Sequence, residues 1–250
     1  MKRAIGMLVV GIILVGITNP VWAMSLKGKI GFGGNYSYLT MNMQDAKDWF
    51  ENYKDFCDNL GRTSELKDFK VDPSFSADIR YGVSDRLVLA LGYSSLSGEQ
   101  ELQVTAPFTE DFNQSAKASG ILGSALLIFP NETVNFYLGG GLGSYSVKFK
   151  SEDFFEFDYI HEKGKASQMG YHLILGLELF LSEKFAVSLE GLYRTLKISE
   201  IDCTESTYAW SVAGDTIKKP VDYNDLGKGT EPLELDFTGF SVGLALRFYL

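Results

Sequence analysis

Long stretches of the chain alternate between large apolar side chains and small or polar ones. The clearest stretch covers residues 167–181, where every second position is large and apolar: Met169, Tyr171, Leu173, Leu175, Leu177, Leu179 and Leu181. Successive side chains of a β-strand point to opposite faces, so this period predicts a strand with one apolar and one polar face. Strands of soluble proteins average about five or six residues. A strand this long is typical of one that crosses a membrane at a tilt.

The same period predicts seven more strands. They are expected at residues 29–38, 74–82, 86–96, 115–129, 134–150, 185–198 and 240–250. In residues 115–129 the assignment of faces stays open, because both the odd and the even positions carry large apolar residues. Aromatic residues near the strand ends are expected to form membrane-interface girdles. They are Tyr36, Tyr38, Tyr81, Tyr93, Phe129, Tyr137, Tyr145 and Phe149.

The connections between these strands alternate in length. Short turns are predicted at residues 83–85, 130–133 and 182–184, and long polar loops at 40–73, 97–114, 151–166 and 199–234. Short turns at one end and long loops at the other are typical of a transmembrane barrel. We therefore expect an all-β fold, a closed antiparallel up-and-down transmembrane barrel of about eight strands.

The first long loop contains a segment with helical rather than extended periodicity. In residues 43–60, apolar residues recur at the spacing of one helical face: Trp49, Tyr53, Phe56 and Leu60. Asp45 near the start and Gly61 past the end are typical helix-terminating residues. This short helix is expected to pack on its own loop, to cap the barrel mouth or to lie on the membrane surface.

The N-terminus has the features of an export signal. Lys2 and Arg3 precede an apolar run at residues 4–17, and the small residue Ala23 follows. This run is shorter than the roughly 20 residues of a membrane-spanning helix, so a cleaved signal peptide is favoured over an N-terminal membrane anchor. The expected division of the chain is a signal peptide at residues 1–23 and an outer-membrane barrel domain at 24–250.

Composition and charge narrow the class of partner. Hydrophobic residues make up 45% of the chain, which is ordinary for a globular protein. A transmembrane barrel has such a composition because only alternate strand residues face lipid. The net charge is −9 and becomes more negative once Lys2 and Arg3 are removed. Nucleic acid is therefore not an expected partner, because its binding requires a basic face.

Three phrases resemble a known family. "YGVSDRLVLALGY" at residues 81–93, "FYLGGGLGSYSV" at 136–147 and "GFSVGLALRFYL" at 239–250 are similar to the outer-membrane-protein β-barrel domain family, the OmpA-, OmpX- and OmpW-like small barrels. The resemblance covers nearly the whole mature chain and implies a barrel in the bacterial outer membrane. It also implies two partners, outer-membrane lipid and the barrel-insertion machinery. Family members typically end in Phe or Trp, whereas this chain ends in Leu250.

The polar face of the predicted strands carries charges of both signs. The expected lumen residues are Lys29, Asp78, Arg80, His172, Glu178, Glu190, Arg194 and Arg247. Buried charges must pair or be hydrated, so we expect Asp78 to pair with Arg80, and Glu190 with Arg194 or Arg247. The interior of an eight-stranded barrel holds side chains and little else. The network therefore predicts a polar plug, with a narrow or gated pore as the alternative.

The remaining chemistry of the sequence is sparse. Cys57 and Cys203 fall in the first and last long loops, which neighbour each other in a closed barrel, so a disulfide between them is predicted. His161 and His172 have no Ser and carboxylate at a catalytic spacing, and we expect no catalytic residue. The acidic loops show no ordered ligand spacing, so no metal or cofactor is expected.

The sequence therefore predicts a small outer-membrane barrel that is structural or surface-interacting. A narrow pore for small solutes, or a surface partner bound through the long loops, stays open. One alternative is a soluble exported barrel that binds a hydrophobic ligand, as lipocalins do, with its large apolar residues facing inward. A lipid-modifying outer-membrane enzyme is a second alternative.

Overall fold

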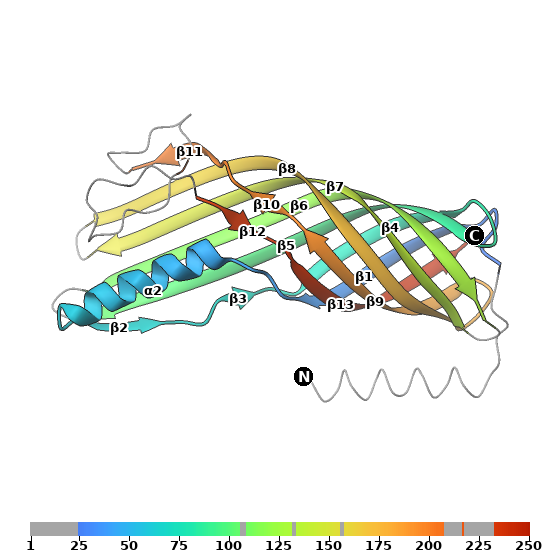
Figure 1. The fold of residues 1–250 in the computed structure, drawn as a ribbon, viewed down its shortest axis with the longest axis horizontal. Coiled ribbons are helices and arrows are strands. Elements are labelled where there is room, and N and C mark those ends of the chain that lie inside the picture. Colours follow the sequence, from blue (N-terminus) through green and yellow to red (C-terminus); the bar gives the residue numbers. More distant parts are fainter. Residues whose placement is uncertain (1–24, 106–108, 132–133, 156–157, 208–216, 218–232) are drawn as a thin grey trace.

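Eight strands close into an antiparallel barrel. The computed structural model describes residues 25–105, 109–131, 134–155, 158–207, 217 and 233–250. The ring strands are β1 (Ile30–Leu39), β4 (Ser74–Gly82), β5 (Leu87–Thr105), β6 (Glu110–Pro130), β7 (Val134–Phe155), β8 (Asp158–Phe180), β9 (Phe185–Thr195) and β13 (Gly239–Tyr249). Each strand pairs with the next in this order, and β13 pairs with β1 (Figure 1). The predicted fold class is confirmed.

The two ends of the barrel are different. β1 starts and β13 ends at the same end, where Gly31 pairs with Tyr249. The tight turns at residues 83–86 and 181–184 lie there as well, and we call it the short-turn end. The opposite end, called the long-loop end, carries the longer connections. The predicted signal peptide lies outside the described residues.

Large apolar side chains cover the outside of the barrel. About half of the surface of each is exposed: Ile30, Phe32, Phe75, Ile79, Leu89, Leu91, Ile121, Leu127, Leu138, Leu142, Leu173, Leu175, Leu177, Leu189, Val242 and Leu246. We call this band the apolar belt. A surface of this kind matches hydrocarbon rather than water. A lipocalin-like barrel requires the opposite orientation, so that alternative is not retained.

The structure also settles the faces of β6 and β7. On β6, Leu122 and Leu126 point into the lumen of the barrel and are buried, so the even positions of this strand face inward. On β7, Tyr137, Tyr145 and Phe149 are buried inside the barrel. Their assignment to the aromatic girdle was wrong, because the odd positions of β7 face inward and only the even ones reach lipid.

Four strands project far beyond the others at the long-loop end. β5 to β8 continue as two paired hairpins, which Figure 1 shows in green and yellow reaching past the rest of the barrel. The prediction of loops at residues 97–114 and 151–166 was therefore wrong. The outward face of these segments is polar, and their inward face is covered by other parts of the chain, so an extended conformation is stable outside the apolar belt. We call this part the extension.

The predicted helix in the first long loop is confirmed as α2 (Gln44–Asn59). It ends before Gly61, whose φ of 74° suits a residue without a Cβ. Its buried residues Phe50, Tyr53 and Cys57 pack against apolar residues of the extension, namely Leu102, Val104 and Phe112. The helix thus covers the extension, rather than the barrel mouth or a membrane surface (Figure 1). No helix of the described residues has the length and apolarity needed to span a membrane.

Short strands complete the long-loop end. β2 (Thr63–Leu66) and β3 (Lys70–Val71) pair with the free edge of β5. β11 (Asp202–Ser206) pairs with β8, and β10 (Lys197–Ile198) pairs with β12 (Leu235–Asp236). These pairings protect the edges of the extension, which would otherwise expose unpaired backbone groups.

The predicted disulfide is absent from the structure. Cys57 and Cys203 are both present as thiols, and both are buried. Cys57 packs between α2 and the β5–β6 hairpin, whereas Cys203 packs on the other side of the extension, where β11 pairs with β8. The two loops emerge side by side in the ring, but each folds onto a different face and carries its cysteine away from the other.

Candidate functional site

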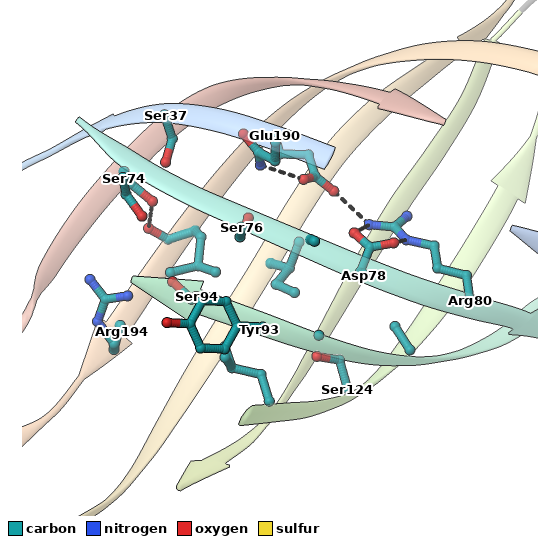
Figure 2. A pocket seen from close by; sticks show the side chains of 18 of the residues that line it. Ser37, Ser74, Ser76, Asp78, Arg80, Tyr93, Ser94, Ser124, Glu190 and Arg194 are labelled. Carbon is teal, nitrogen blue, oxygen red and sulfur yellow. Dashed lines mark hydrogen bonds and ion pairs between the residues drawn. The ribbon is translucent and has the colours of Figure 1, made fainter. Parts of the chain in front are cut away.

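A group of charged side chains occupies the middle of the barrel lumen. Asp78 and Arg80 come from β4, Glu178 from β8, Glu190 from β9 and Arg247 from β13. We call these five residues the lumen network. Figure 2 shows Asp78 beside Arg80, with Glu190 reaching the same guanidinium from another strand. The alternation along each strand places them all on the inward face.

Glu190 is the centre of the network. Its Oε1 atom accepts hydrogen bonds from Arg80 (2.7 Å), from Arg247 (2.6 Å) and from the hydroxyl of Tyr137. Its Oε2 atom accepts one from the amide of Asn35 at 2.7 Å. Both guanidinium groups lie over the Tyr137 ring, 5.1 and 5.9 Å from its centroid. The ring face thus adds a cation–π attraction to the two ion pairs.

Arg247 joins Glu190 to the other two carboxylates. Its guanidinium lies 3.5 Å from Asp78 and 3.5 Å from Glu178, and it also donates to the hydroxyl of Ser188. Glu178 accepts a further hydrogen bond of 2.8 Å from the hydroxyl of Tyr249. The side chain of Arg247 is fully buried, with 0% exposure. Several donors and acceptors therefore compensate each buried charge, as a water-poor interior requires.

The structure places the predicted pairs as follows. Asp78 and Arg80 pair at 3.0 Å, and Glu190 pairs with Arg247 rather than with Arg194. Glu190 and Arg194 lie four residues apart on β9 and both face the lumen, but their side chains extend to different partners. Arg194 instead lies on the other side of the cavity, where its Nε is 3.5 Å from the carbonyl of Phe237 (Figure 2).

His172 and Lys29 flank the lumen network. His172 Nε2 lies 2.8 Å from the hydroxyl of Ser124, on the long-loop side. Lys29 precedes β1 at the short-turn end, where its carbonyl accepts a hydrogen bond of 3.0 Å from the backbone N–H of Gly82. Of the eight predicted lumen residues, the structure thus brings five together and leaves Lys29, His172 and Arg194 around them.

Sequence reasoning missed the uncharged members of the network. Tyr137, Tyr249 and Asn35 bind its carboxylates, yet their types suggest a membrane girdle or a turn. The signal was their parity, since Tyr249 shares a face with Arg247, and Tyr137 shares one with Tyr145. Inward parity on a strand that also has exposed apolar neighbours would have identified them.

An apolar cluster closes the lumen at the long-loop end. Its buried members come from β5, β6 and β7, from the segments that follow β1 and β9, and from the segment before β13. They include Met41, Leu96, Ala118, Leu122, Tyr145, Val147, Leu196, Ile198, Leu235 and Phe237. We call it the outer cluster. A second group, the inner cluster, lies at the short-turn end with Leu26, Val88, Leu126, Ile128, Phe180, Ala186 and Tyr249. The lumen network lies between them.

Glycines create the space for the outer cluster. A Cβ atom on Gly120 or Gly143 would lie 2.5 or 2.8 Å from the Tyr145 ring, and one on Gly170 would lie 3.2 Å from it. The ring therefore occupies the volume that side chains from three adjacent strands would fill.

A small cavity remains between the two clusters. Its volume is about 70 Å³, and its polar lining includes Asn35, Ser76, Asp78, Ser94, Glu190 and Arg194 (Figure 2). A volume of about 10–15 Å³ on this measure holds one water molecule, so the cavity accommodates a few waters. It is too small for an organic solute.

A buried carboxyl group lies inside the extension, outside the apolar belt. Asp153 is 5% exposed and lies on the inner face of β7, diagonal to Glu162 on the neighbouring strand β8. Burial, and secondarily the negative charge of Glu162, raise the pKa of Asp153 to about 7. Its Oδ1 atom has no hydrogen-bond partner. Ionisation of Asp153 therefore opposes folding of the extension.

Replacing Asp153 with Asn should remove a pH dependence of stability. A carboxyl whose pKa is higher in the folded than in the unfolded state stabilises at low pH, and this stability is lost as the pH rises from about 4 to about 7. Urea unfolding in detergent at pH 5 and pH 8 measures the difference. At pH 8 the free energy of unfolding of Asp153→Asn should exceed that of the wild type by about 2–4 kcal/mol. At pH 5 the difference should shrink to about 1–2 kcal/mol, because the folded carboxyl group is then mostly protonated.

Asp153→Glu is the matched control, because it keeps a carboxyl group in the extension and should keep the pH dependence. Equal pH dependence of the wild type and Asp153→Asn would show that this carboxyl is not desolvated as the structure places it.

Several solved structures are similar to this chain. None of the curated protein sequences matches this chain. Similar solved structures include OprG from Pseudomonas aeruginosa, with 10% identity, a TM-score of 0.47 and coverage of 90% of this chain and 96% of OprG. The N-terminal β-barrel domain of Pseudomonas aeruginosa OprF has 9% identity, a TM-score of 0.41 and coverage of 90% and 98%. Ail of Yersinia pestis, in complex with a heparin analogue, has 12% identity, a TM-score of 0.43 and coverage of 90% of this chain and 99% of Ail.

A family sequence profile matches a longer part of the chain than the three solved structures above. The sequence profile described as "Outer membrane protein beta-barrel domain" matches residues 12–248. That range contains all eight ring strands but for the last residue of β13. The protein therefore belongs to the outer membrane protein β-barrel domain family, which indicates a location in the bacterial outer membrane.

Proposed function

We propose that the protein is a closed outer-membrane barrel that acts through its surface and does not form an open pore. The observation that carries this proposal is the outer cluster, which fills the lumen at the long-loop end with packed apolar side chains. Water and ions cross a barrel only along a continuous polar path. The lumen network and its small cavity lie on the short-turn side of this cluster.

The extension supports a surface role. It continues four strands beyond the apolar belt and is covered by α2, β2, β3 and β11 around apolar cores of its own. Ordering this much backbone is costly unless packing stabilises it. A barrel that served only as a membrane anchor would need no such structure. The extension thus offers a rigid platform for a partner outside the cell, while lipid contacts the apolar belt.

The proposal includes the route to the membrane. The N-terminal segment is a signal peptide cleaved after Ala23, and the barrel-insertion machinery then inserts the mature chain. The short-turn end faces the periplasm, because the termini of the barrel and the tight turns gather there in such proteins. The long-loop end and the extension then face outward.

A lipid-modifying enzyme is a weaker reading of the same residues. Ser124 and His172 form a serine–histidine pair at 2.8 Å. However, Nδ1 of His172 has no hydrogen-bond partner, and a catalytic imidazole of this type needs a carboxylate there to orient it. His172 is also 2% exposed and points into the closed lumen, away from lipid.

Conductance in planar lipid bilayers tests the proposal. The refolded wild-type protein should give no ion conductance above that of the bare bilayer. Tyr145→Ala removes the outer-cluster ring that fills the space over Gly120 and Gly143, and should produce measurable channels. Tyr145→Phe keeps the ring and should stay silent.

Stable conductance of the wild type, with selectivity that changes on substitution of Arg80, would instead support a pore gated by the lumen network. That result would overturn the closed-barrel proposal.

A further inference from the structure

The outer face of β6 to β8 carries a row of three lysines just beyond the apolar belt. Lys117 pairs with Lys148, and Lys148 pairs with Lys165, across three adjacent strands. All three side chains are exposed. Residues directly opposite on neighbouring strands lie about 4.5–5.5 Å apart at their Cβ atoms, and like charges there destabilise the pair. We call these residues the lysine row. Its charge repulsion favours the binding of an anion.

The described carboxylates near the lysine row form no ion pair with it. In the next row outward, Lys150 and Lys163 have their own partners, Glu152 at 2.5 Å and Glu205 at 2.9 Å. Within the described parts of the chain, the ion pairs include no member of the lysine row. Glu99 on β5 accepts a hydrogen bond from Asn113 instead.

The nearest carboxylate in register is Asp202, which lies opposite Lys165 on β11 without an ion pair between them. One carboxylate at the edge of the row leaves most of its positive charge uncompensated.

Hydroxyl groups separate the lysine row from the apolar belt. The adjacent row toward the belt consists of Ser119, Ser146 and Ser167, again paired across the same three strands. The row after that contains Ile121 and Met169, which are 61% and 59% exposed. Along β6 and β8 the order is thus apolar, hydroxyl, ammonium, whereas β7 carries a second hydroxyl, Ser144, between Ile121 and Met169.

This order matches the layers of a lipid leaflet. Ile121 and Lys117 are four residues apart, so their Cα atoms are separated by about 13 Å along the strand. With a strand tilt of about 35–45°, the separation along the barrel axis is about 10 Å. Headgroups occupy the layer immediately outside the hydrocarbon, and lysine side chains reach toward it along their alkyl stems. The ammonium groups therefore reach the depth of headgroup phosphates.

We propose that the lysine row and the serine row bind the phosphate of a lipid headgroup in the leaflet that faces the long-loop end. Ammonium and hydroxyl groups both donate to phosphate oxygens, and phosphate charge offsets the repulsion among the lysines. A lipid is favoured over a soluble anion because its acyl chains contact the apolar belt on the same strands. The net charge of −9 disfavours soluble polyanions. The inference rests on the proposed location and orientation, but not on the closed lumen.

Lipid binding by the refolded full-length protein tests this. Diphosphoryl lipid A is titrated into protein held in phosphatidylcholine nanodiscs, and bound lipid is counted by native mass spectrometry. A variant with Lys117→Gln, Lys148→Gln and Lys165→Gln should bind it roughly 100- to 200-fold more weakly, given the contribution of each basic residue near a lipid surface. Lipid A without phosphates should bind the wild type as weakly as diphosphoryl lipid A binds the triple glutamine variant.

The matched control changes the same charge elsewhere. Lys54→Gln, Lys70→Gln and Lys197→Gln alter lysines of α2, β3 and β10 that already pair with carboxylates, and should leave lipid binding unchanged. Arginine at the three positions of the lysine row should retain binding. If the triple glutamine variant does not fold, Lys148→Gln alone should still weaken binding roughly 5-fold.

Three results would overturn the proposal. They are equal binding by wild type and the lysine-row variants, equal loss in the control variant, and full competition by millimolar inorganic phosphate, which would indicate a site for a free anion. A conducting barrel would contradict the closed lumen and leave this proposal intact, so the two failures are distinguishable.

Discussion

Replacing Arg247 with Met should destabilise the barrel by about 3–5 kcal/mol, because removing one partner of a buried ion pair leaves the others uncompensated. Arg247 contacts Glu190 at 2.6 Å, and Asp78 and Glu178 at 3.5 Å each. Without Arg247, the lumen network contains three carboxylates and one guanidinium group, that of Arg80. Urea unfolding in detergent, followed by tryptophan fluorescence, measures the loss.

A second substitution separates charge from packing. Glu190→Gln, added to Arg247→Met, removes the carboxylate that had the shortest ion pair with Arg247 and should recover part of the stability. Arg247→Lys keeps the charge but loses the second hydrogen-bonding nitrogen. Its free energy of unfolding should lie between those of the wild type and Arg247→Met. A double variant no more stable than Arg247→Met would mean that lost packing, and not unpaired charge, causes the effect.

Truncation of Phe237 to Ala should cost about 3–5 kcal/mol, the usual range for a buried phenylalanine. Its side chain is 0% exposed and belongs to the outer cluster, where residues from distant parts of the chain meet. Its backbone N–H donates to the carbonyl of Leu196 at 2.8 Å, so the segment before β13 is held at this point. The same urea unfolding experiment measures the change.

Phe237→Leu is the matched control, since it keeps an apolar side chain of similar reach and should cost clearly less than the alanine variant. A loss below about 1 kcal/mol for Phe237→Ala would indicate that the side chain is not packed in a sealed cluster. That outcome would also weaken the case for a closed lumen.

The period of the sequence determined the barrel. Two-residue alternation requires nothing beyond the strand itself, because each residue's parity decides which face it joins. The existence of the eight strands, the apolar outer face at 167–181 and the inward charges on β4, β9 and β13 all follow from it. The pair of Asp78 and Arg80 is predictable for the same reason, since two residues apart on a strand means the same face.

The rest depended on long-range packing. Register pairs Glu190 with Gly243, not with Arg247, so their ion pair forms only because the long arginine side chain reaches along the lumen. Parity was ambiguous on β6 and misassigned on β7, because a tyrosine suits an interface girdle and a glycine-lined lumen equally. Only the neighbouring strands, with glycines at 120, 143 and 170, decide between the two.

The long-loop end shows the limit most clearly. Residues 97–114 and 151–166 are polar enough to form loops. Residues 97–105, 110–114, 151–155 and 158–166 nevertheless extend as strands, because α2 packs on the inner face of β5 and β6 and β11 pairs with the edge of β8. The same coverage keeps Cys57 and Cys203 apart, and brings Leu196 and Phe237 together above the lumen. Periodicity is a local property and determined which face each strand residue occupies. Burial depends on which distant segment covers that face, and only the tertiary structure decided this.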